Sequence, residues 1–108
     1  MPDRTWKKAE RKVAELVDGR RLPVSGRGGQ PDILNVRLAI EVKHRRTLPQ
    51  WLLDALRQAE QAATPGQLAV VVLHQRGQRY ADSLVIVRLK AFREWLGWAE
   101  RVAQDGRA

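Results

Sequence analysis

The sequence has no cysteine and no long apolar run, and both absences narrow the class of protein. Without cysteine there is neither a disulfide framework nor a cysteine-ligated zinc site. A membrane-spanning helix needs about 20 consecutive apolar residues, and this chain has no such run. The charged first segment, MPDRTWKKAERK, lacks the apolar core of a signal peptide. We therefore expect an intracellular, cytoplasmic protein with no membrane partner.

Acidic residues are few relative to basic ones. The chain has twelve Asp and Glu residues and twenty Lys and Arg residues, which gives a formal charge of +8 over 108 residues. A cation that contacts a nucleic-acid phosphate releases condensed counterions, so a small basic protein favours a polyanionic partner. A charged surface that only keeps the protein hydrated is the alternative. The length and the 44% share of hydrophobic residues fit one domain over 1–108.

Apolar residues recur at helical spacing in three segments, namely 3–18, 49–63 and 90–104. Five other segments are typical of strands: 20–24, 32–36, 38–44, 68–74 and 83–89. The segment 68–74 is continuously apolar, so we expect a strand that is buried on both faces. The resulting order, α-β-β-β-α-β-β-α, predicts an α/β fold with a mixed central sheet of about five strands flanked by helices.

Charged residues interrupt two of the predicted strands. Asp32 opens the second strand, and Glu41 and Lys43 lie in the third. Side chains two residues apart share a face of a strand, so Glu41 and Lys43 point the same way. A hairpin in which position 33 lies opposite 40–42 then brings Asp32 close to Glu41.

Two neighbouring carboxylates repel each other, and a divalent cation relieves that repulsion. Mg²⁺ prefers oxygen ligands and is held by one or two carboxylates together with water and substrate phosphate. Here Asp32 and Glu41 would supply the carboxylates, and the backbone carbonyl of Val42 a third oxygen. This set suits hydrolysis of a phosphodiester, because a bound metal lowers the pKa of water. Lys43 would orient that water or stabilise the negative charge that develops on the phosphate.

The first predicted helix carries two acids, Glu10 and Glu15, beside its apolar stripe. The stripe consists of Trp6, Ala9, Val13, Leu16 and Val17. At about 100° per residue, Glu15 lies roughly opposite the stripe and Glu10 lies at its edge. We expect Glu15 to face solvent, and Glu10 to face the sheet and act as an outer ligand of the metal or water. The alternative is a surface ion pair of Glu10 with Lys7 or Arg11.

The pair Pro31-Asp32 followed by Glu41-Val42-Lys43 matches the PD…ExK form of the PD-(D/E)xK nuclease signature. The order of the surrounding elements resembles the αβββαβ, restriction-endonuclease-like core of that superfamily. The segments AERKVAELVDG, VSG, PDIL and LAIEVKHR, within residues 9–46, resemble the archaeal-type Holliday junction resolvases in particular. The likeness to residues 47–108 lies only in the order of elements.

The resemblance implies an activity and a set of site residues. The activity is structure-selective DNA cleavage that resolves four-way junctions by paired phosphodiester hydrolysis, in a prokaryotic cell or one that a phage infects. A homodimer would cut two opposed strands with Mg²⁺ or Mn²⁺. The resemblance implies catalytic roles for Glu10, Asp32, Glu41 and Lys43, with Ser25 near the scissile phosphate. The implied metal ligands are Asp32, Glu41, Val42 and Glu10.

Basic residues surround the predicted site, and contacts to phosphate position DNA without reading its sequence. We expect DNA contacts from Lys7, Arg11, Arg20, Arg21, Arg27, His44, Arg45 and Arg46. Lys8 and Lys12 are better explained as solvated charges. The sequence has no recognition-helix motif, so it predicts binding by DNA shape. Gln58, off the apolar stripe of the second helix, is a further candidate to face the site.

Four tryptophans are many for 108 residues. Trp6 and Trp95 fall on apolar stripes and are predicted to lie in the core. Trp51 and Trp98 lie off or at the edge of their stripes, and exposed aromatic residues often mark interfaces. We expect Trp51, Leu53 or Trp98 to contribute to the symmetric contact of a homodimer.

Two other functions stay open on the sequence. One is a different nuclease, of repair or restriction type, that uses the same site. The other is a non-catalytic, basic DNA-binding domain in which the acids only balance charge. The chain has two histidines, too few for a histidine metal site, so His74 is predicted to have a structural role.

Overall fold

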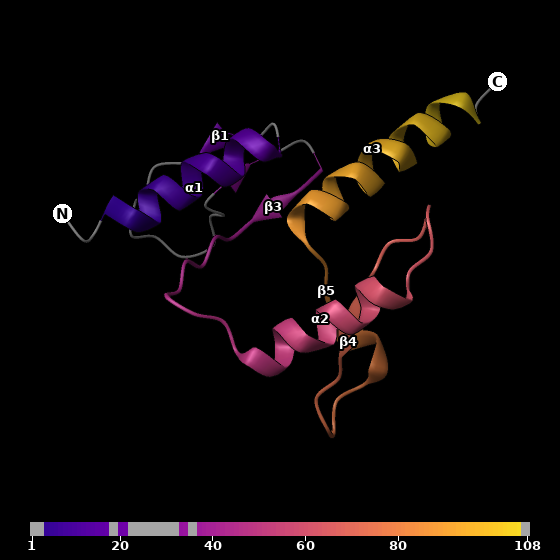
Figure 1. Cartoon of the computed structure of the whole chain (residues 1–108). Helices are drawn as coiled ribbons and strands as arrows, with labels where there is room; N and C mark the ends of the chain where they lie inside the picture. Colours follow the sequence, from indigo (N-terminus) through magenta and orange to yellow (C-terminus); the bar gives the residue numbers. More distant parts are fainter. Residues whose placement is uncertain (1–3, 18–19, 22–32, 35–36, 107–108) are drawn as a thin grey trace. The chain divides into compact units, whose positions relative to one another are not determined.

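The computed structural model describes residues 4–17, 20–21, 33–34 and 37–106. Within these residues the chain forms three α-helices and five short strands (Figure 1). It divides into two compact units: unit 1 is Met1–Arg46 and unit 2 is Thr47–Ala108. The single domain expected over 1–108 stays a prediction.

Helix α1 (Arg4–Leu16) belongs to unit 1 and buries a face that includes a carboxylate. From 4 to 17 the sequence has neither glycine nor proline, the residues least favourable in a helix. Ala14 and Val17 are buried together with Glu10, which is only 4% exposed. Leu16, expected in the apolar stripe, is exposed. The buried face is therefore rotated from the predicted stripe toward Glu10, and Glu15 faces solvent as expected.

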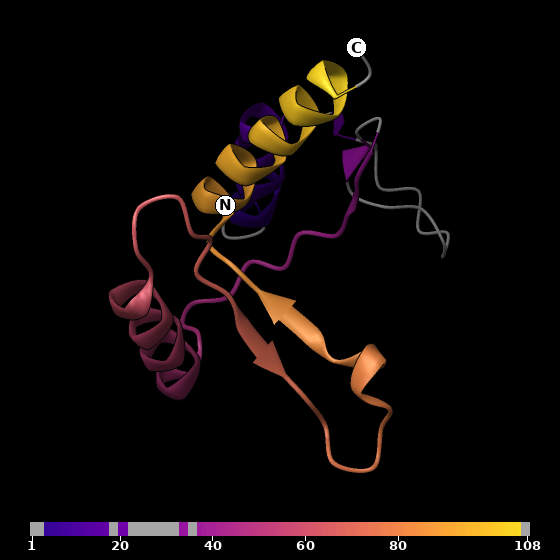
Figure 2. The same cartoon turned by 90° about the vertical axis from the view of Figure 1, so that its right-hand side faces the viewer.

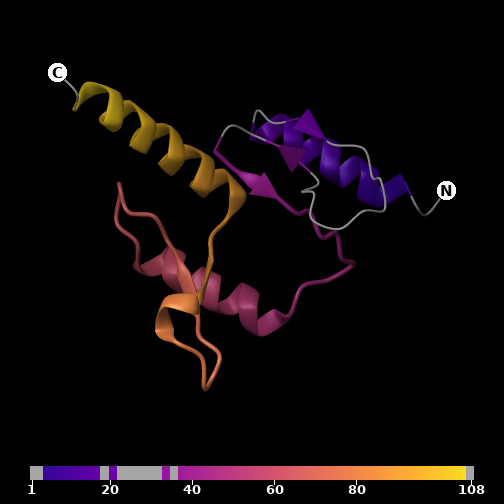
Figure 3. The ribbon, with the colours of Figure 1, turned by 180° about the vertical axis from the view of Figure 1, so that it is seen from behind.

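A small antiparallel sheet accompanies α1 in unit 1, with the strand order β1-β2-β3. Its strands are β1 (Arg20–Arg21), β2 (Ile33–Leu34) and β3 (Ala39–Ile40). Arg21 pairs with Ile33, and Ile33 pairs with Ile40, so β2 is central. β-branched isoleucine suits a pleated surface. Helix α1 packs against β1, as Figure 3 shows from behind.

Helix α2 (Gln50–Ala62) belongs to unit 2 and follows Pro49, whose carbonyl accepts the first helical hydrogen bonds. The fixed φ of proline favours the start of a helix. Leu56 is the buried residue of α2. The helix ends before a turn in which the N–H of Gln67 donates to the carbonyl of Thr64 at 3.0 Å. Gly66 follows Pro65 there with a φ of 89°, as a type II turn requires.

Two strands, β4 (Val71–Leu73) and β5 (Leu84–Ile86), form an antiparallel hairpin in unit 2 (Figure 2). Val72 lies opposite Val85, and both are exposed. The strand expected to be buried on both faces is therefore open to solvent on one of them. The connecting loop, 74–83, contains a turn at Gly77, whose φ is 89°, and the short 3-10 helix η1 (Tyr80–Asp82).

Helix α3 (Leu89–Asp105) begins directly after Arg88, whose carbonyl accepts a hydrogen bond of 2.9 Å from the N–H of Phe92. The rings of Phe92 and Trp95 stack with centroids 6.3 Å apart. Trp95 is nevertheless exposed, so its predicted place in the core is wrong; its ring lies beside an open pocket instead. Among the described helices, none has the length and the apolar character needed to cross a membrane.

The expected mixed central sheet of about five strands, and with it the restriction-endonuclease-like core, is wrong for the described residues. The strands form two antiparallel sheets, one of three strands and one of two. Parallel neighbours need a crossover of a dozen or more residues, usually a helix. The polar loop 74–83 contains no helix longer than the single 3-10 turn η1, so the chain folds straight back and β4 pairs with β5 antiparallel.

Candidate functional site

The hairpin of β2 and β3 borders the predicted acid pair. Ile33 pairs with Ile40, which confirms the expected register of position 33 opposite 40–42. Glu41 follows Ile40 directly in the chain. Asp32 precedes Ile33 in the sequence and lies outside the described residues. The part of the site that the structure describes is therefore the β3 side of the hairpin.

Glu41 and Lys43 lie on the same side of the chain, as the alternation of side chains predicts. The Nζ of Lys43 is 3.0 Å from Oε2 of Glu41, and Val42 between them is half-buried. Both residues follow the end of β3 instead of lying inside a strand over 38–44. The side chain of Glu41 is 53% exposed and that of Lys43 65%. An ion pair so exposed contributes roughly 0–1 kcal/mol to stability, and both groups are accessible to a ligand.

Glu10 is a buried carboxylate on α1 and has an interaction partner. Its burial argues against the alternative of a solvated surface pair with Lys7 or Arg11, because both of those residues are exposed. A carboxylate is retained in a buried place when it is paired or binds a cation. Since α1 packs against β1, Glu10 lies on the helix that borders the sheet of the predicted site.

The side chains expected to contact DNA are mostly exposed where the structure describes them. These exposed residues are Lys7, Arg11, His44, Arg45 and Arg46. The ammonium of Lys7 lies 5.4 Å from the centroid of the Trp6 ring, a cation–π distance. Arg20 and Arg21 form β1. Ser25 and Arg27 lie outside the described residues, and the DNA contacts of the whole set stay a prediction.

Basic charge is concentrated in unit 1, which carries the predicted site. Unit 1 holds twelve of the twenty Lys and Arg residues but six of the twelve Asp and Glu residues. Unit 2 is longer and holds the remaining eight cations and six anions. Most of the excess positive charge therefore belongs to unit 1, the unit that contains the β2–β3 hairpin.

Glu41 and Val42 each offer an oxygen of the type that a hard cation prefers. The accessible carboxylate of Glu41 and the neighbouring carbonyl of Val42 are oxygen ligands, which Mg²⁺ and Mn²⁺ prefer. Within the described residues, no three side chains of His, Cys, Asp or Glu gather as a metal-binding group. The predicted ligand set includes Asp32, which lies outside them, so the magnesium site stays a prediction.

The residues predicted to form a dimer contact lie in unit 2. Trp51 and Trp98 are exposed, and Leu53 is half-buried. Such exposure is what an interface residue of an isolated chain shows. Gln58 is exposed on α2. The homodimer and the role of Gln58 both stay predictions.

A pair of rings at the end of the β4–β5 hairpin was missed by sequence reasoning. His74 stacks on Tyr80 with ring centroids 4.1 Å apart and an interplanar angle of 18°. The Nε2 of His74 is 2.7 Å from the carbonyl oxygen of Gln78. These contacts are of the kind that the structural role predicted for His74 requires. The sequence signal is a tyrosine within a polar loop between two apolar strands.

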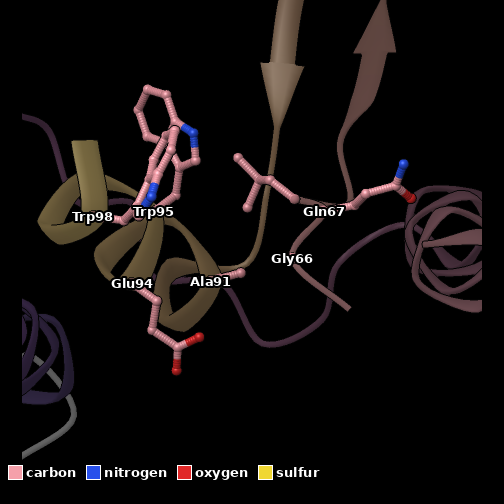
Figure 4. Close-up of a pocket in the computed structure, with 7 residues that line it drawn as sticks. Gly66, Gln67, Ala91, Glu94, Trp95 and Trp98 are labelled. Atoms are coloured by element: carbon pink, nitrogen blue, oxygen red, sulfur yellow. The ribbon is translucent and has the colours of Figure 1, made fainter. Parts of the chain in front are cut away.

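A pocket of about 480 Å³ opens in unit 2 between α3 and the turn that follows α2 (Figure 4). It is lined by Gly66, Gln67, Leu68, Ala91, Glu94, Trp95 and Trp98. The two tryptophan rings extend to the same side of α3, and Glu94 extends to the other side (Figure 4). These described lining residues belong to unit 2 and include none of those predicted to act in catalysis.

The described geometry thus brings Glu41 and Lys43 together and buries Glu10 on the helix beside the sheet. Asp32, Ser25 and Arg27 also belong to the predicted site, but they lie outside the described residues. Comparison of the chain with models of protein families, with curated proteins and with solved structures finds no match.

Proposed function

We propose that the chain is a metal-dependent DNA endonuclease whose catalytic residues border the β2–β3 hairpin. The observation that carries the proposal is the antiparallel pairing of Ile33 with Ile40. In such a pair the next positions outward are 32 and 41, and we take Asp32 and Glu41 as the two carboxylates that hold Mg²⁺ or Mn²⁺. The proposal needs this local hairpin and no larger sheet.

The position of Lys43 supports the proposal. Its ammonium is 3.0 Å from the carboxylate of Glu41, so a cation already lies beside a proposed metal ligand. A bound divalent metal supplies Lewis acidity and a water nucleophile at neutral pH. Lys43 would hold the attacking water or offset the negative charge that develops on the phosphate. Glu10, buried on α1, would orient the ligands from the helix side.

The charge of unit 1 supports DNA as the substrate. Its surplus of cations accompanies the proposed catalytic residues, and such a surplus attracts the phosphate backbone without reading sequence. The finer proposal, that the enzyme resolves four-way junctions as a homodimer, rests on the PD…ExK resemblance. Two cuts in one junction need two active sites at a fixed separation, and a two-fold dimer supplies them.

The deciding experiment measures cleavage of labelled junction, flap, nicked and linear duplex DNA with Mg²⁺ or Mn²⁺. Asp32→Asn and Glu41→Gln are each expected to abolish cleavage, whereas binding in EDTA or Ca²⁺ stays within about two- to threefold because the phosphate contacts remain. Asp54→Asn removes an exposed carboxylate of α2 and is the matched control, with unchanged cleavage. Full activity of Asp32→Asn would remove the catalytic assignment. Equal cutting of linear duplex would favour a repair- or restriction-type nuclease.

A second candidate is a non-catalytic, basic DNA-binding domain. The exposed ion pair of Glu41 and Lys43 favours it, because each group already neutralises the other without a metal. This candidate predicts junction binding without cleavage in either metal. Calorimetry with a cleavage-resistant phosphorothioate junction separates the two candidates. Uptake of Mg²⁺ or Mn²⁺ that Glu41→Gln removes supports the nuclease, and no uptake by the unmodified chain supports the binding domain.

A further inference from the structure

The end of the β4–β5 hairpin presents an aromatic ring to solvent. We call residues 74–82 the hairpin tip. Tyr80 is 81% exposed, although its ring stacks on that of His74 at 4.1 Å. A ring that is stacked on one side and still so exposed leaves its other face open to solvent. In Figure 2 the hairpin tip extends away from α2 and α3, the helices of the same unit.

The hairpin tip is held by its own hydrogen bonds. The N–H of Gln78 donates to the carbonyl of Gln75 at 3.1 Å, and the N–H of Asp82 donates to the carbonyl of Arg79 at 3.0 Å. The guanidinium of Arg79 also donates to the carboxylate of Asp82, with Nε 3.1 Å from Oδ2. Tyr80 is therefore positioned before any ligand binds, which lowers the entropy lost on binding.

The hairpin tip also contains a cation without a partner among the described residues. Arg76 is exposed, and its side chain has no ion pair or hydrogen bond with the described residues. Arg79, in contrast, forms an ion pair with Asp82. An exposed aromatic ring and an arginine on one short loop suit single-stranded nucleic acid, because a base stacks on the ring and the cation contacts a backbone phosphate.

We propose that the hairpin tip binds an unpaired DNA base, with Tyr80 stacked on the base and Arg76 on an adjacent phosphate. The choice of DNA rests on the proposed function, but the binding requires neither the catalytic residues nor a metal. Bases inside a continuous duplex are already stacked on their neighbours and leave no face for Tyr80. The hairpin tip therefore directs the chain to DNA that contains unpaired bases, such as bulges and imperfect branch points.

The test compares a duplex that carries a two-nucleotide bulge with the same duplex fully paired, in EDTA. One bulged base is 2-aminopurine, whose fluorescence falls when it stacks. The unmodified chain is expected to bind the bulged DNA more tightly and to quench the probe. Tyr80→Ala should weaken binding to the bulged DNA by about 5- to 100-fold, with no quenching and with little change for paired DNA. Tyr80→Phe keeps the ring and should keep both effects.

Further variants distinguish base stacking from a structural role of the ring. Tyr80→Trp enlarges the ring and should quench the probe at least as strongly, and the melting temperature of each variant reports the fold. Arg76→Gln should reduce the slope of log affinity against log salt by about one. Equal affinity of the unmodified chain for both duplexes overturns the proposal, as does an unchanged preference in Tyr80→Ala or a lost preference in Tyr80→Phe.

Cleavage by the unmodified chain, measured in parallel with Mg²⁺, separates this proposal from the proposed function. Cleavage of DNA together with equal binding of bulged and paired DNA contradicts the hairpin-tip proposal alone. A preference for bulged DNA without cleavage of any substrate contradicts the nuclease proposal alone.

Discussion

Arg88 donates two hydrogen bonds to the carboxylate of Glu60 and so joins the residue before α3 to helix α2. The Nε of Arg88 is 2.5 Å from Oε2, and its Nη2 is 3.3 Å from Oε1. This two-pronged geometry is among the stronger forms of ion pair. The hydrogen bond from Arg88 lowers the pKa of Glu60 below its ordinary value, and the same bond raises the pKa of Arg88. The pair therefore links two helices of unit 2.

The first prediction concerns the pH dependence of this link. Because the pKa of Glu60 is lowered in the folded state, the pair stabilises the fold above the ordinary pKa of glutamate, and the contribution is lost as the pH falls through the lowered value. Glu60→Gln should lower the melting temperature by a few degrees at pH 7. At a pH below the lowered pKa of Glu60, it should leave the melting temperature unchanged. Glu94→Gln, which alters an exposed carboxylate of α3, is the control. An equal fall in the melting temperature of Glu60→Gln at both pH values would contradict the prediction.

The second prediction compares two glutamates on one helix. Glu10 is buried and Glu15 is exposed on α1. If Glu10 orients ligands of the active site, Glu10→Gln should slow DNA cleavage by about 10- to 100-fold, and Glu15→Gln should leave it unchanged. Single-turnover cleavage of junction DNA measures both. Thermal melting is the companion measurement, and similar cleavage by the two variants at similar stability would remove the role of Glu10.

The third prediction concerns the lysine beside the proposed metal ligand. Lys43→Ala should lower the single-turnover cleavage rate by about 100- to 1000-fold, because it removes a cation placed to stabilise developing charge. DNA affinity in Ca²⁺ should change by less than about threefold, since only one of many cations is lost. Lys90→Ala removes an exposed lysine of α3 and is the matched control. A fall in affinity as large as the fall in rate would make Lys43 a DNA-binding residue instead.

The fourth prediction concerns association of the chain. We expect sedimentation to show a dimer, and Trp51→Ser or Trp98→Ser to weaken it by about tenfold or more, because exposed tryptophans dominate many interfaces. Leu48→Ser changes another exposed apolar residue and should leave the dimer intact. A monomer at working concentrations, both alone and on junction DNA, would contradict the homodimer.

Local signals predicted the helices closely. The segments 3–18 and 49–63 correspond to Arg4–Leu16 and Gln50–Ala62. Their ends follow from residues adjacent in the chain, such as the proline before α2 and the Pro65–Gly66 turn after it. The β2–β3 register was predictable for the same reason, since a short hairpin restricts which residues can face each other.

The assembly of the strands was not predictable from periodicity. An apolar strand such as 68–74 has the same pattern whether it is central in a sheet or half of a hairpin, and Val72 proves to be exposed. The side of α1 that is buried depends on what packs against it, so Glu10 lies within the buried face and not at its edge. The stack of His74 on Tyr80 depends on the exact path of a loop, for which the sequence has no periodic signal.

The unequal division of charge between the two units gives the chain a polarity along its sequence. Because the cationic surplus lies mainly in Met1–Arg46, long-range attraction acts on that unit before any contact forms. Electrostatic attraction toward a polyanion would then act mainly on the unit that contains the β2–β3 hairpin. Such attraction acts over roughly a Debye length, about 10 Å at 0.1 M salt. Added salt should therefore lower the association rate with DNA more than it raises the dissociation rate.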